Sequence, residues 1–322
     1  MVTTRLYTHG MLTTEGFPVE EISDHIATDN CTVWADFLSP TAEDLDAIAE
    51  ELGLHPLAVE DAVHSFQRAK LDRYDTHLFL AAYAVSLDTG TGELSTHEIK
   101  AFITPRALVT VHTEDFDMTR VVARWDTDKD LARHGVAYLL WGLLDEIVDG
   151  HFETVLALDG ASEELEDALF DDRPRDKEVQ RRSFEFRKSL VLLRRVVLPM
   201  REIVNTVLRR DLEILDKEMS PYFQDVYDHV LRATEWTESL RDLVATILDT
   251  NLSIQSNRMN LIMKKVTSWA AIIAVPTAIT GFFGQNLTFV GFGTAWGAWA
   301  SLGLIAVTSA ALYLQFKKRD WI

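Results

Sequence analysis

Apolar positions divide the chain into three parts with different periodicities. In residues 1–115, short runs rich in β-branched and aromatic residues alternate with short amphipathic stretches, a pattern that predicts an α/β domain. From about Gly135, apolar residues recur at steps of three and four, which predicts long helices. Two runs without a charged residue follow, at 266–283 and 296–316. Each is long enough, or nearly so, to cross a hydrocarbon core of roughly 30 Å.

The first part contains recognisable local signals. Acidic residues at the start of the stretch 39–52 predict a helix capped by Ser39 or Thr41. A second short helix is expected at 55–64, where Pro56 is tolerated in the first turn. The predicted strands are 32–37, 78–87, 97–104 and 107–112, and DTGTGE (88–93) forms a turn between two of them.

Three long helices are expected in the middle of the chain. The first runs from about Gly135 to a charged turn at 171–178, and the second from about Lys177 to Leu215. The third begins near Pro221 and meets no helix breaker until Pro276. A helix of that length is typical of a stalk or of a shaft that enters a membrane.

Basic residues flank the two uncharged runs on one side. Lys264 and Lys265 precede the first run, and Lys317, Lys318 and Arg319 follow the second. By the positive-inside rule, both termini are expected in the cytoplasm of a multi-pass protein of the cell (inner) membrane. The alternative is a buried hairpin in a soluble core, which would leave the matching basic flanks unexplained.

The net charge and the cysteine content limit the partners and the cellular compartment that this chain is expected to have. The net charge is −19, and residues 266–322 contain three basic residues and one acid, which leaves −21 for residues 1–265. So acidic a chain is not expected to bind nucleic acid, whereas divalent cations would neutralise it. Cys31 is the only cysteine, so no intrachain disulfide can form, which fits a reducing compartment. The N-terminus lacks the apolar stretch of a cleavable signal peptide.

One face of the first apolar run is small or mildly polar throughout. Two interpretations remain open: packing between helices of one protomer, or the lining of a pore. Two spans cannot enclose a pore, so the second interpretation requires a homo-oligomer. Neither span contains an acid, a lysine or a histidine, which favours a passive path lined by neutral oxygens and suited to hydrated Mg²⁺. The face consists of Asn260, Met263, Thr267, Ala270, Ala274, Thr277 and Gly281.

Enzymatic motifs are missing from the sequence. We find no phosphate-binding loop, metalloprotease motif or nucleophile elbow, so an enzyme is not expected. The histidines at 55, 64, 77 and 151 lack the spacing of metal ligands and are expected at the surface or as caps.

Several segments together resemble the CorA family of divalent-cation channels. They are KKVTSWAAIIAVPTAITGFFGQN (264–286) with the second span and the terminal KKRDWI, the segment 55–80, LPMREIV (198–204) and PYFQDVYDHV (221–230). The resemblance covers nearly the whole chain in the same order. It implies a homopentamer that moves Mg²⁺, and often Co²⁺ or Ni²⁺, down its electrochemical gradient, while some relatives handle Zn²⁺.

The resemblance also implies an α+β/α organisation. It divides the chain into a cytoplasmic α/β domain (1–134), a cytoplasmic long-helix region forming a funnel and stalk (135–265), a pore-lining transmembrane helix (266–284), an external loop (285–295), a second transmembrane helix (296–316) and a basic cytoplasmic tail (317–322).

Site residues follow where the motifs match. Gly284, Gln285 and Asn286 match the Gly-Met-Asn signature, whose asparagine ring binds hydrated cation at the outer mouth. The small face described above matches the family's pore lining. The family usually has a bulky residue at the position of Ala274, so Met263 and Val266 are expected to form the hydrophobic gate.

Regulatory residues follow in the same way. Asp225 matches an aspartate that binds regulatory Mg²⁺ between neighbouring cytoplasmic domains, and Asp88 aligns with its partner acid.

Two departures from the family's pattern leave the preferred metal open: Gln285 replaces the usual methionine, and the loop 287–297 has no acid. The alternatives are a Zn²⁺, Co²⁺ or Ni²⁺ transporter of the same fold, with or without coupling to protons, or a non-conducting membrane scaffold.

Overall fold

The computed structural model describes the chain except for residues 65–66, 89–90, 170–175, 210–215, 286–289 and 291–292. The described residues form two compact units, Met1–Ile247 and Leu248–Ile322. The first unit therefore joins the predicted 1–134 domain with most of the predicted 135–265 region.

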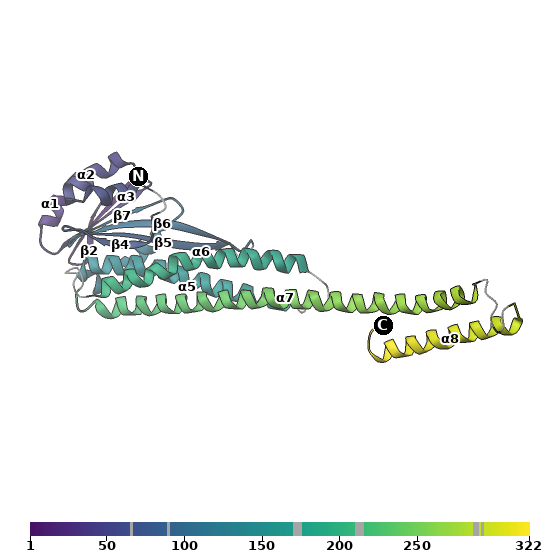
Figure 1. Ribbon diagram of the computed structural model, residues 1–322. Helices are drawn as coiled ribbons and strands as arrows, with labels where there is room; N and C mark the ends of the chain where they lie inside the picture. Colours follow the sequence, from purple (N-terminus) through teal and green to yellow (C-terminus); the bar gives the residue numbers. More distant parts are fainter. Residues whose placement is uncertain (65–66, 89–90, 170–175, 210–215, 286–289, 291–292) are drawn as a thin grey trace. The chain divides into compact units, whose positions relative to one another are not determined.

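A seven-stranded mixed sheet is the centre of the first unit (Figure 1). The strands are β1 (Val2–Thr8), β2 (Met11–Glu15), β3 (Cys31–Leu38), β4 (Lys70–Arg73), β5 (Leu78–Asp88), β6 (Glu93–Ile103) and β7 (Ala107–His112), in the order β2-β1-β3-β7-β6-β5-β4. Strands β3 and β7 pair in parallel, and the other neighbouring strands pair antiparallel.

Helices cover both faces of this sheet, so it has a core on each side. Three short helices pack on one face: α1 (Ile22–Ala27), α2 (Ala42–Leu52) and α3 (Pro56–Val63). The other face carries α4 (Met118–Trp125), α5 (Val136–Leu169), α6 (Asp176–Leu208) and the first turns of α7 (Ser220–Phe283). Side-chain alternation separates the cores: Phe79 and Ala81 face the short helices, whereas Leu78 and Leu80 face the long ones.

Local chemistry explains where the short helices begin. Thr41, rather than Ser39, caps α2 in a capping box with Asp44, and Gly53 ends that helix in the left-handed region at φ 60°. Helix α3 begins at Pro56, and His55 caps it by accepting a hydrogen bond from the amide of Leu57 at 3.2 Å.

Helices α4 and α5 pack closely where Trp125 meets Gly142. The Trp125 indole donates to the carbonyl of Leu139 at 3.0 Å and lies directly over Gly142. A Cβ at residue 142 would lie 2.5 Å from the indole nitrogen, so any side chain there would displace the tryptophan.

The predicted elements in the first unit are largely confirmed. All four predicted strands are present, and β5 and β6 form a hairpin in which Asp88 pairs with Glu93. Strands β1, β2 and β4 and helices α1 and α4 were not predicted; β2 has no buried position, and α1 has six residues. The second long helix was expected to reach Leu215, and this was wrong, because α6 ends at Leu208.

The second unit consists of the C-terminal part of α7 and of α8 (Ala295–Lys318). Helix α7 passes through Pro276 without ending and stops at Phe283. Within the described residues, α7 and α8 are the two helices long and apolar enough to cross a membrane, with mean hydropathies of 1.6 and 1.5 over their most apolar stretches. Only 6% of each stretch is buried within the chain, as expected for helices that meet lipid or other chains.

Candidate functional site

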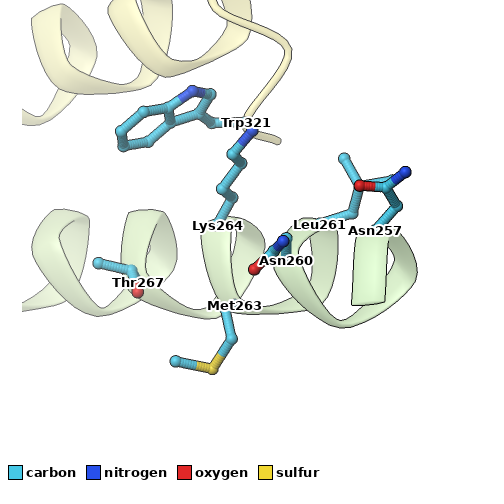
Figure 2. A pocket seen from close by; sticks show the side chains of 7 residues that line it. All are labelled: Asn257, Asn260, Leu261, Met263, Lys264, Thr267 and Trp321. Atoms are coloured by element: carbon cyan, nitrogen blue, oxygen red, sulfur yellow. The ribbon is translucent and has the colours of Figure 1, made fainter. Parts of the chain in front are cut away.

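The predicted pore face of α7 is exposed along its whole length, and Figure 2 shows side chains from its N-terminal part. Its residues are exposed, whereas Ser268 is fully buried and Ile272, Val275 and Ile279 are half-buried on another side of the helix. Helix α8 is the other helix of this unit. The exposed residues are Asn260, Met263, Val266, Thr267, Ala270, Ala274, Thr277 and Gly281.

Two glycines near the end of α7 have different surroundings. A Cβ added at Gly281 would have no neighbour within 4 Å, so packing inside the chain does not require a glycine there. At Gly284 the added Cβ would lie 3.0 Å from the carbonyl oxygen of Thr280, which is tighter than usual. Gly284 is thus explained by the turn that ends α7, while the small size of Gly281 leaves room for something outside the chain.

Hydroxyl groups on this part of α7 are hydrogen-bonded to its own backbone. Thr277 donates to the carbonyl of Ile273 at 3.0 Å, and Thr280 donates to that of Pro276 at 2.9 Å. Each hydroxyl proton is therefore used internally, and the oxygen lone pairs remain as acceptors. At Thr277 these acceptors lie on the exposed face, where they could accept hydrogen bonds from the water shell of a cation.

The signature triplet is described only in part. Gly284 donates its amide to Thr280 at 2.8 Å, and Gln285 follows it as an exposed residue. Asn286 lies outside the described residues. Its place at the mouth of a pore, and the filter of Gly284, Gln285 and Asn286, therefore remain predictions.

Asp88 is exposed at the tip of the β5–β6 hairpin. Its carboxylate accepts a hydrogen bond from the amide of Thr91 at 3.2 Å, as expected of a turn aspartate. The tip is held against α6, because Ser189 donates to the carbonyl of Gly92 at 2.8 Å. The acid is thus presented at a fixed place on the surface of the first unit.

Asp225 is also exposed, but at the other end of the sheet. It lies two turns into α7, on the side opposite the buried Phe223 and Val226. In Figure 1 the start of α7 lies at the end of the sheet away from the β5–β6 hairpin. The two acids are therefore not brought together within one chain, and a metal ion shared by both would have to lie between two chains.

Another group of potential metal ligands was missed by the sequence reasoning. Ligand atoms of Asp145, Asp149 and His229 all lie within 4.8 Å of one another. Arg124 contacts both carboxylates and lies 2.9 Å from Asp149. The carboxylates are thus paired with an arginine. We interpret the group as an ion-pair network that links α4, α5 and α7. Only the four-residue spacing of the acids on α5 hints at it in the sequence.

Two histidines differ from expectation because they are buried. His151 was expected at the surface or as a cap, but it is fully buried and binds the carbonyl of Tyr83 at 2.7 Å. Burial lowers its pKa to about 4, so it is neutral at physiological pH. His77 is also buried, stacked on Tyr74, and burial lowers its pKa as well. His55, by contrast, is confirmed as a cap.

Comparisons with known proteins agree with this architecture. The CorA-like Mg²⁺ transporter protein family matches residues 29–318. The Bacillus subtilis protein YfjQ is 30% identical over 95% of this chain and 94% of its own length. The cobalt/magnesium transport protein CorA of Thermotoga maritima is 29% identical over 85% and 79%, respectively. The zinc transport protein ZntB of Yersinia pseudotuberculosis is more distant, at 22% identity over 92% and 89%.

A solved structure shares the fold. The complete CorA magnesium transporter of Methanocaldococcus jannaschii superimposes with a TM-score of 0.79 over 100% of this chain and 98% of its own, at 22% identity. The family match covers most of the sequence, and the matched residues include both helices that are long and apolar enough to cross a membrane. The chain is therefore a transporter of divalent cations rather than an enzyme, and it belongs to the CorA-like Mg²⁺ transporter family.

Proposed function

We propose that five copies of this chain form a Mg²⁺ channel in the cell (inner) membrane, with both termini in the cytoplasm. The observation that carries this proposal is the exposed face of α7, which is made of small, hydroxyl and amide side chains with two apolar residues at one end. Five such faces around an axis would line a path with neutral oxygens. Such a lining suits Mg²⁺, which gives up its water reluctantly.

Assembly around α7 gives each feature of this face a role. Gly281 has open space around it, and five backbones could approach closely there. Met263 and Val266 are exposed apolar residues at the other end of the face, suited to a gate that closes by excluding water. Gln285 and Asn286 would follow the last turn of α7 and place two amides at the mouth.

The first unit supports a role in sensing cytoplasmic Mg²⁺. Asp88 and Asp225 are both exposed and lie at different ends of the sheet, so a bound ion would join neighbouring protomers. Facing acidic surfaces repel one another, and bridging cations would favour a closed, symmetric packing. When Mg²⁺ falls, the bridges would empty and the packing would loosen.

The filter assignment is tested by ion flux. We expect Asn286→Ala to abolish most Mg²⁺ uptake into proteoliposomes, because the ring of amides at the mouth is lost. Gln285→Ala is the companion variant and is expected to shift the order of metal preference. Unchanged Mg²⁺ uptake in Asn286→Ala would show that the filter has been assigned wrongly.

A second candidate function is transport of Zn²⁺, Co²⁺ or Ni²⁺, with or without protons. It is kept because Gln285 replaces the expected methionine and because a zinc transport protein is among the relatives. A flux panel of Mg²⁺, Co²⁺, Ni²⁺ and Zn²⁺, with and without a pH gradient, separates the two functions. Normal assembly without flux of any ion would instead identify a non-conducting scaffold.

The sensor is tested by proteolysis. We expect millimolar Mg²⁺ to protect the wild-type cytoplasmic part, and Asp225→Ala to remain sensitive under the same conditions. Asp228→Ala is the matched control, because Asp228 is exposed one turn further along α7 and bonds to Gln224 at 3.1 Å. Equal protection of wild type and Asp225→Ala would remove Asp225 from the sensor.

A further inference from the structure

Helix α6 carries a stripe of apolar side chains that points away from its own chain. Phe184, Val191 and Leu198 follow one another at seven-residue steps and are 70%, 56% and 39% exposed. Seven residues make nearly two helical turns, so the three side chains lie on one side of the helix. Leu193 and Val197 are buried on the opposite side. Burial within the chain therefore does not explain why the three positions of this α6 stripe are apolar.

Basic side chains flank the α6 stripe. Residues 179–208 contain seven Lys and Arg residues and two Glu residues. Four of the basic side chains are exposed and form no ion pair with a carboxylate in the part of the chain that the structure describes: Arg187, Lys188, Arg195 and Arg201. The stripe thus has an apolar centre and cationic edges. Such a surface suits an anionic partner that also offers apolar contacts.

The exposed side of α5 has the complementary composition. Helix α5 contains nine acids and neither Lys nor Arg. Leu156 is 45% exposed, and Gly160 follows it one turn later. The exposed carboxylates on this side, which form no ion pair with a described residue, are Glu153, Glu163, Glu164 and Asp167. These six residues form the α5 face, which has a small apolar centre and anionic edges.

Gly160 gives the α5 face room for a large side chain. A Cβ added at residue 160 would meet no atom within 4 Å, so packing inside the chain does not require a glycine there. Gly160 and Ala161 also line an open cavity of about 640 Å³, whose apolar lining includes Leu87 and Leu165. An aromatic ring from outside the chain can anchor in such a place.

We propose that the α6 stripe of one copy docks on the α5 face of the next copy, with Phe184 seated against Gly160 and the basic edges beside the acids. A second copy fits because this same chain supplies both the negative charge and the cavity that the stripe needs. The two surfaces also match in length, since residues 184–198 and 153–167 each extend over about 21 Å at 1.5 Å per residue.

This contact joins two different surfaces, so it repeats from copy to copy and closes into a ring. The inference rests on the proposed assembly of several copies. It adds to that assembly which surfaces of the first unit meet.

Disulfide crosslinking in full-length, detergent-solubilised protein tests the contact. Two differently tagged chains, one with Gly160→Cys and one with Phe184→Cys, are produced together and oxidised. We expect a two-chain product that carries both tags, which can form only between copies. Arg201→Cys replaces Phe184→Cys in the control, because residue 201 is exposed on α6 but lies about 26 Å further along the helix. Its yield should be at least about tenfold lower, since Cα atoms more than about 7 Å apart cannot be bridged.

A charge placed in the middle of the α6 stripe tests the complementarity. Val191→Glu, introduced into the Phe184→Cys chain, sets a carboxylate against the acids of α5, and we expect the yield of the crosslink to fall about tenfold. Leu57→Glu is the matched control, because Leu57 is as exposed as Val191, at 58% and 56%, but lies on α3. Equal yields from the two variants would overturn the docking of the stripe on α5.

The mass of the uncrosslinked particle separates this inference from the proposed channel. Particles of five chains that give no more crosslink than the Arg201→Cys control would overturn the contact, assign the α6 stripe to another partner and leave the channel proposal standing. Particles of one chain would overturn both the contact and the assembly on which it rests.

Discussion

Asp36 and His112 form a buried ion pair that links β3 to β7. The Nε2 atom of His112 lies 3.0 Å from an Asp36 oxygen, and its Nδ1 atom lies 2.8 Å from the carbonyl oxygen of Thr113. Both partners are acceptors, so only the doubly protonated ring can donate to both. Thr110 donates to the other Asp36 oxygen at 2.5 Å, which completes the network. Burial opposes the charged ring, but the bonds to Asp36 and Thr113 outweigh it and raise the pKa of His112.

This raised pKa makes the stability of the first unit depend on pH. Below about pH 6.5, the ordinary pKa of histidine, the stabilisation is fully present, and it is lost as the pH rises through the raised pKa. We expect His112→Gln to lower the free energy of unfolding by about 1–3 kcal/mol at pH 6 and by less at pH 9. Thermal unfolding at both pH values measures this. His97→Gln is the control, and a pH-independent loss in His112→Gln would contradict the prediction.

At the scale of elements, α7 combines two different environments in one helix. Its first turns bury Phe223, Val226 and Val230 in the core of the first unit, whereas its last turns leave most side chains exposed. Pro276 lies inside the helix without ending it, and Thr280 donates to the Pro276 carbonyl. The sequence predicts the length of α7, because it has no helix-breaking residue before Pro276. Only the burial pattern shows which face of the helix is exposed.

Cysteine substitution distinguishes the two faces at this end of α7. We expect flux through Thr277→Cys to be blocked by a water-soluble thiol reagent, because residue 277 lies on the proposed pore face. Ile279→Cys is the control two residues further on, because Ile279 lies on the half-buried side of the helix, and its flux should be unaffected. The single native cysteine, Cys31, is buried, which limits background labelling. Equal block of both variants, or of neither, would remove Thr277 from the pore lining.

The whole molecule exposes more apolar surface than an isolated chain in water would tolerate. Large apolar side chains such as Met263, Ile273 and Phe282 are more than half exposed on α7, and Val307 and Leu314 are exposed on α8. Surface of this kind is covered by lipid or by other chains. Both coverings fit a transporter family with membrane helices.

The proposed assembly is measurable directly. Because five pore faces are needed to enclose the path, we expect the purified protein to have five times the mass of one chain. Native mass spectrometry, or light scattering corrected for bound detergent, gives this number. A stable monomer or dimer that still conducts would contradict a pore built around α7.

The sequence by itself determined the features that depend on neighbouring residues. The strands 78–87 and 107–112, the cap at Thr41, the long helices and the two uncharged runs all follow from periodicity and short-range hydrogen bonding. The order of motifs along the chain also pointed to the correct family. These signals come from residues close together in the sequence, so they do not depend on the tertiary packing of the chain.

Only the tertiary structure decided which distant residues meet. Asp36 and His112 are 76 residues apart in the sequence, and the contact between Arg124 and the acids of α5 has no distinctive sequence signal. His151 carries a polar ring into the core, where periodicity alone expects an apolar residue. The parallel pairing of β3 with β7 likewise depends on the crossover between them. Such contacts form when the whole chain packs, because burial and long-range pairing, rather than local propensity, set their free energy.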